Sequence, residues 1–181
     1  FIWDASRGTW KFVGSGVKAT SKVVFDMSNY IGARWHHNIT ITWADVLAQL
    51  YQFFDITYNA TKAASEPAVA SLWRSTLDTI VGYRIDEANK RLEVYLNYWH
   101  FEPAYIASFA TINIYLPFEL VLAEDYLVFT RGSYAYSTSA ATAKRVPQLN
   151  LVLSGHVADM ASALQTFLTQ NYFPASVFTV G

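Results

Sequence analysis

Hydrophobic positions between residues 43 and 54 recur at the spacing of an α-helix. The apolar side chains fall at i, i+3, i+4, i+7, i+8 and i+11 and form one stripe: Trp43, Val46, Leu47, Leu50, Tyr51 and Phe54. Thr42 precedes this stripe, and Asp45 follows Thr42 by three residues, as in a capping box. The pattern predicts an amphipathic helix that begins at Thr42 and packs on a sheet or on other helices.

Alternation with a period of two residues marks the expected strands. Residues 9–28 are typical of strands around a Gly-Ser-Gly turn, and residues 23–27 alternate between two faces. Residues 79–85 and 91–98 flank a polar turn at 86–90. In the second of these strands the aliphatic residues face one way, while Glu93 and Tyr95 face the other. We expect an antiparallel hairpin with one face toward solvent.

Further segments carry helix start signals. Pro67 suits a first turn, where no N–H donor is needed, and the buried side of that helix is expected to carry Val69, Leu72 and Trp73. Pro103 and Pro117 indicate helices over 101–110 and 116–129, and residues 137–148 form either a short helix or a loop. A last helix from near Ser154 has the apolar stripe Val157, Met160, Ala161, Leu164, Phe167 and Leu168. The order of elements predicts a single α+β domain over residues 1–181, with an antiparallel sheet packed against helices.

Composition narrows the functional classes. Hydrophobic residues make up 52% of the 181 residues and charged residues 15%, which argues against disorder. A net charge of −1 without a basic run argues against a nucleic-acid partner, and no apolar stretch approaches the ~20 residues of a membrane span. The absence of cysteine excludes disulfides and thiolate metal sites. The aromatic share of 17% fits a core of large rings with tyrosines at its rim, or an aromatic surface for sugars, peptides or a partner.

Candidate catalytic and metal sites are few. His36 and His37 are adjacent and would point to opposite faces of a strand, so one metal ion would not readily take both. Asn38 instead favours a tight turn at this point, because it tolerates the left-handed conformation. The chain has no nucleophile elbow, and its Gly-Ser-Gly turn is no P-loop. We therefore expect no catalytic residue, no metal site and no cofactor.

Two sequence features bear on location. Phe1 stands where a start methionine would be expected, so we expect an excised piece of a longer protein. The sequons at Asn38 and Asn59 are compatible with secretion.

The segment "ARWHHNITITWADV" resembles the signature of extracellular solute-binding protein family 5, which serves ABC importers of peptides, nickel and oligosaccharides. That family carries an aromatic-His-Asp-Gly turn, a Pro, an aliphatic-Thr pair and an Asp-Val that opens a helix. Trp35-His36, Ile41-Thr42 and Asp45-Val46 match this pattern. His37-Asn38 stands in place of Asp-Gly, and Thr40 in place of Pro. The hairpin segment and "INIYLPFELV" also resemble family segments, so that the likeness spans roughly residues 22–122 and is nearest to archaeal members.

The resemblance implies a fold and a function. The fold would be the α+β subdomain that decorates the first lobe of a periplasmic-binding-protein-like structure. The whole protein would capture a solute outside the cell, an oligopeptide or alternatively an oligosaccharide, and deliver it to an ABC permease. The fragment would do no chemistry, and its partners would be the remaining lobes of the parent protein. By the same resemblance, Thr111, Asn113 and Tyr115 would lie near the ligand cleft, or else cap and pack the following helix.

Two further interpretations remain open at this point. Exposed aromatics around Trp99, Phe101 and Tyr115 would indicate ligand binding if they line a groove, and docking on a partner lobe or permease if they form a flat patch. An enzyme would need a pocket that joins one of the four histidines to a carboxylate such as Asp45 or Glu119.

Overall fold

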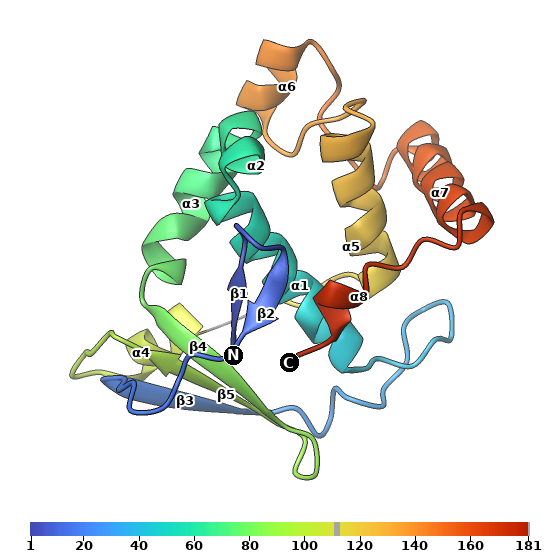
Figure 1. Ribbon diagram of the computed structural model, residues 1–181. Helices are drawn as coiled ribbons and strands as arrows, with labels where there is room; N and C mark the ends of the chain where they lie inside the picture. The colour runs from blue at the N-terminus through green and yellow to red at the C-terminus, as the bar shows by residue number, and fades with distance from the viewer. Residues whose placement is uncertain (111–112, 181) are drawn as a thin grey trace.

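The computed structural model describes residues 1–110 and 113–180, which form an α+β fold (Figure 1). All strand pairs are antiparallel, as expected. One sheet has the order β3-β5-β4, so β3 and β4 are its edge strands, and a separate two-stranded sheet lies near the N-terminus. The strands are β1 (Ile2–Asp4), β2 (Thr9–Lys11), β3 (Ser21–Asp26), β4 (Ile80–Asp86) and β5 (Arg91–Leu96).

Helices pack above and beside the larger sheet (Figure 1). In the described ranges no helix is both long and apolar enough to cross a membrane. The helices are α1 (Trp43–Tyr58), α2 (Ala60–Ser65), α3 (Pro67–Leu77), α4 (Pro103–Ala110), α5 (Phe118–Asp125), the π-helix η1 (Tyr126–Thr130), α6 (Thr138–Lys144), α7 (Ser154–Thr169) and α8 (Ala175–Phe178).

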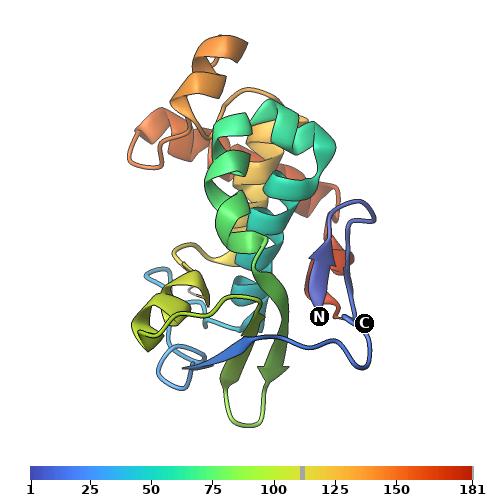
Figure 2. The same cartoon turned by 90° about the vertical axis from the view of Figure 1, so that its left-hand side faces the viewer.

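Helix α1 is the centre of the fold, and it packs against helices on one side and the sheets on the other (Figures 1 and 2). The main hydrophobic core joins α1 to both sheets through buried side chains such as Leu50, Phe54 and Leu92. A second core lies between α5, η1 and α7 around Leu127 and Met160. Because α1 is covered on both sides, polar residues outside its apolar stripe are also buried.

The corner before α1 has the predicted geometry. Asn38 adopts a φ of 70°, and the N–H of Trp35 donates to the carbonyl of Ile39 at 2.9 Å, which closes a tight turn. The hydroxyl of Thr42 accepts from the N–H of Ala44 at 3.2 Å, while Asp45 accepts from the N–H of Thr42 at 2.7 Å. The capping box is therefore confirmed, and His37-Asn38 lies in a tight turn, as predicted.

Several expectations about burial were wrong. Leu72 is 69% exposed, because α3 buries Ala70 and Leu77 instead. Helix α7 leaves Val157 and Leu168 exposed, since its contact with α5 runs along Met160, Ala163 and Phe167. Strands do flank the Gly-Ser-Gly turn, as expected, and they belong to different sheets: β2 pairs with β1, and β3 pairs with β5. The predicted hairpin of β4 and β5 is confirmed, but Glu93, which was expected on its solvent face, is buried.

Gly82 of β4 lies against the start of the chain. A Cβ atom added there would lie 2.7 Å from Cγ2 of Val13 and 3.1 Å from the carbonyl oxygen of Phe1. These distances are shorter than ordinary van der Waals contacts, so the site requires a residue without a side chain.

Candidate functional site

Two of the residues expected near a ligand lie together in one groove. Asn113 and Tyr115 line a cavity of about 460 Å³ beside the edge strand β3. The remaining lining residues are Phe25, Asp26, Met27, Tyr30 and Ile114. The phenol of Tyr30 donates to the carbonyl of Ile114 at 2.8 Å and so fixes the segment against the loop that follows β3. We call this cavity the 113–115 groove; the third expected residue, Thr111, lies outside the described residues.

Trp99 is not among the residues that line the 113–115 groove. It is 67% exposed and follows β5 in a segment with two more exposed rings, Phe101 and Tyr105. The ring of His100 lies 4.4 Å from that of Phe101 and 4.5 Å from that of Tyr105. Trp99 therefore does not share the 113–115 groove with Asn113 and Tyr115.

Tyr115 faces the negative charge of α5. Desolvation by the surrounding protein, followed by the charges of Glu124 and Asp125, raises the pKa of Tyr115 to about 12. The phenol therefore stays neutral at physiological pH and can donate a hydrogen bond to a ligand. Tyr115, one lining residue of the 113–115 groove, is thus influenced by the charges of two carboxylates that the sequence did not single out.

Glu124 has a raised pKa and, unlike its neighbour Asp125, no ion-pair partner among the described residues. Burial raises its pKa to about 7, and Nε2 of Gln52 donates to its Oε2 at 3.4 Å. No salt bridge within residues 1–110 and 113–180 includes Glu124, whereas its neighbour Asp125 pairs with Lys62 at 2.8 Å. Glu124 is therefore a buried carboxyl that changes charge near neutral pH.

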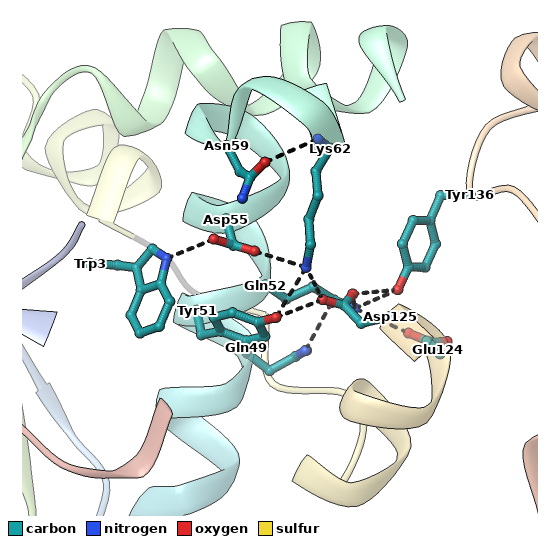
Figure 3. Close-up of polar contacts among 10 residues, drawn as sticks. All are labelled: Trp3, Gln49, Tyr51, Gln52, Asp55, Asn59, Lys62, Glu124, Asp125 and Tyr136. Atoms are coloured by element: carbon teal, nitrogen blue, oxygen red, sulfur yellow. Dashed lines mark hydrogen bonds and ion pairs between the residues drawn. The ribbon is translucent and has the colours of Figure 1, made fainter. Parts of the chain in front are cut away.

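A buried polar network surrounds Lys62, and we call it the Lys62 network (Figure 3). Nζ of Lys62 lies 2.8 Å from Oδ2 of Asp55, 2.8 Å from Oδ2 of Asp125 and 3.1 Å from the phenol of Tyr51. The indole of Trp3 donates to Asp55 at 3.0 Å. The outer members are Gln52 and Tyr136, which both donate to Oδ1 of Asp125. Side chains from β1, α1, α2 and α5 are thereby joined.

The Lys62 network borders a cavity of about 240 Å³. The pKa values of its lysine and of Tyr51 are nevertheless raised, so both groups stay protonated. Burial alone would lower the pKa of Lys62, yet the charges of Asp125 and Asp55 raise it above its usual value. Burial, and then the charge of Asp125, raises the pKa of Tyr51 as well. A lysine nucleophile or a tyrosine base would need a lowered pKa, so neither residue is prepared for that role. The network acts as a polar connection between elements.

The sequence contained only weak signals for this network. Gln49, Gln52 and Asp55 recur at every third position beside the apolar stripe of α1, which indicates a second buried face. The partners lie far away in sequence: Asp125 is 63 residues from Lys62. The π-helix after Asp125 was missed entirely, because the segment 116–129 has an ordinary helical composition. Helices of this kind occur frequently at functional sites.

The histidines do not form a metal site. Among the described residues, no group of three or more His, Cys, Asp or Glu side chains could hold an ion. His37 does contact a carboxylate: its Nε2 lies 3.2 Å from Oε1 of Glu119, and both side chains are partly exposed. Glu119 also lines an apolar groove of about 470 Å³ between α5 and α7. A pocket beside a histidine–carboxylate pair therefore exists, but the lining residues include no serine, threonine or lysine nucleophile.

Comparison with known proteins returned no match among protein-family models, curated proteins or solved structures.

Proposed function

We propose that the chain is part of an extracellular solute-binding protein that captures a solute for an ABC importer. The 113–115 groove is the observation that carries this proposal. It is concave, it combines apolar side chains with the polar groups of Asn113 and Tyr115, and ligand sites have this character. The resemblance of the corner at residues 33–46 to solute-binding family 5 supports the same reading.

An oligopeptide is the first choice of solute. The groove lies beside β3, an edge strand, and an extended peptide can add to a strand edge through main-chain hydrogen bonds. Asp26, an exposed carboxylate that lines the groove, would favour a ligand with a positive group, such as a peptide ammonium. An oligosaccharide is the alternative, since Phe25, Tyr30 and Tyr115 could stack on sugar faces.

A thermal-shift screen on the full-length protein separates these ligand classes. A solute present at about a hundred times its dissociation constant stabilises the folded state by about 2.7 kcal/mol. We expect stabilisation by short peptides and none by oligosaccharides. Stabilisation by sugars alone would select the alternative, and no response to either class would contradict the solute-binding proposal.

The exposed rings of Trp99, Phe101 and Tyr105 support a second candidate, a docking surface for a partner lobe or the permease. Trp99→Ser and Phe101→Ser in the full-length protein separate the two roles. Docking predicts weaker association with reconstituted permease and unchanged solute affinity, while a ligand role predicts weaker solute affinity.

A further inference from the structure

The outer edge of β4 is partly occupied by the start of the chain. The N-terminal nitrogen of Phe1 donates to the carbonyl of Tyr83 at 2.7 Å, and the N–H of Tyr83 donates to the carbonyl of Phe1 at 2.7 Å. Such reciprocal bonds define a hydrogen-bonded pair of antiparallel strands. Phe1 therefore adds one residue of a new strand to the sheet.

The next residue of β4 whose backbone groups point outward has no strand beside it in the described part of the chain. In antiparallel sheets the direction of the backbone groups alternates, so Ile85, two residues beyond Tyr83, points its N–H and C=O to the same outer side. Among residues 1–110 and 113–180, no backbone hydrogen bond from outside the sheet reaches Ile85. An unpaired edge of this kind is a template for another strand.

A groove of about 770 Å³ adjoins this edge. Its apolar lining comes from separate elements, with Trp43 and Leu47 from α1 and Phe178 from α8. Phe12 also lines it and is 72% exposed. Phe1 and the C-terminal residues Thr179 and Val180 also line this groove. The unpaired backbone groups of Ile85 and the apolar lining of this groove are therefore accessible on the same side of β4.

We infer that this edge receives a strand from the remainder of the parent protein, antiparallel to β4 and in register with Phe1. The inference rests on the proposed function, in which the chain is a subdomain of a longer protein. The residue opposite Ile85 would face Trp43 and Leu47 and is apolar. The residue opposite Arg84 would lie on the other face, where Arg84 pairs with Glu93, and is polar or acidic.

A second copy of the chain does not fit the edge. A two-fold antiparallel pairing centred on Ile85 would place Tyr83 of each copy opposite Glu87 of the other. The outward groups of Tyr83 are already bonded to Phe1, so only Ile85 would remain for pairing. A strand that continues the direction of Phe1 meets no such conflict.

Amide hydrogen exchange tests the inference. The amide of Ile85 should exchange at least about a hundredfold more slowly in the full-length protein than in the 181-residue chain, because it gains a main-chain hydrogen bond. The amide of Tyr83, which is bonded to Phe1 in the chain itself, serves as the internal reference and should change little. Equal exchange of Ile85 in both proteins would overturn the inference.

A strand extension of the 181-residue chain provides an independent measurement. The residues Thr-Val-Glu placed before Phe1 put Val opposite Ile85 and Glu opposite Arg84, whereas Gly-Ser-Gly is the matched control. We expect slower exchange of the Ile85 amide and a higher unfolding midpoint with Thr-Val-Glu only. Identical behaviour of the two extensions would show that the edge does not accept a strand. Solute affinity is measured separately, so a failure here is distinct from a failure of the solute-binding proposal.

Discussion

Asp45 holds the N-terminus of α5 as well as its own helix. Its Oδ1 accepts from the N–H of Phe118 at 2.9 Å, 73 residues further along the chain, while Oδ2 accepts from the N–H of Thr42. The capping residue that the sequence predicts for one helix is therefore also the N-terminal hydrogen-bond partner of a second. This double role places the segment 113–117, and with it the 113–115 groove, relative to β3.

Asp45→Ala should lower the free energy of unfolding by more than the loss of a single helix cap does. The change removes acceptors from two helix starts, and Asp45 is buried, so we expect a loss of about 2–3 kcal/mol in the free energy of unfolding. Urea denaturation of the 181-residue chain measures it. The exposed Glu102→Ala is the control, and a loss no larger than that control would contradict the double role.

Glu124 should make the protein less stable as the pH rises. The folded-state pKa of about 7 lies above the ordinary value of 4.5, so the folded protein keeps a proton that the unfolded chain releases between these values. The unfolding free energy should fall by up to about 3 kcal/mol from pH 4.5 to pH 7 and then level off. Glu124→Gln should remove this decline and raise stability at pH 8, while the partly exposed Glu119→Gln should leave it in place. A decline of the same size in Glu124→Gln would refute the assignment.

Lys62→Met should be strongly destabilising. It leaves Asp55 and Asp125 buried without their cation, and loss of one partner from a buried ion pair costs about 3–5 kcal/mol. Lys11, which pairs with Asp4 at the surface, provides the comparison: Lys11→Met should change stability by less than about 1 kcal/mol. Similar thermal unfolding midpoints for the two variants would argue against a structural role of the Lys62 network.

Gly82→Ala should lower the free energy of unfolding, whereas Gly155→Ala should raise it. The added methyl group at residue 82 meets Val13 and the carbonyl of Phe1, and such overpacking costs about 1–3 kcal/mol. At residue 155, in the first turn of α7, no atom from outside the adjoining helix backbone lies within 4 Å of the new Cβ, and alanine favours the helix by up to about 1 kcal/mol. Chemical denaturation of both variants checks the signs. Equal effects would mean that Phe1 does not pack against β4 as described.

Local patterns in the sequence predicted the local features of the fold. Thr42 and Asp45 identified the start of α1, Asn38 identified the turn before it, and the polar residues 86–90 identified the hairpin. The burial of a helix face depends on which other element packs against it, and the sequence does not show this. Leu72 and Leu168 were therefore predicted to be buried, although they are exposed. The Lys62 network could not be predicted, because Lys62 and Asp125 meet only after α1, α2 and α5 have packed together.

The affinity of the full-length protein for its solute tests the central proposal most directly. Asn113→Ala and Tyr115→Ala, measured by titration calorimetry with the peptide selected in the screen, should each weaken binding about tenfold, or about 1.4 kcal/mol. Tyr172→Ala, which alters an exposed ring outside the 113–115 groove, should leave the affinity unchanged. Unchanged affinity in both groove variants would contradict the account.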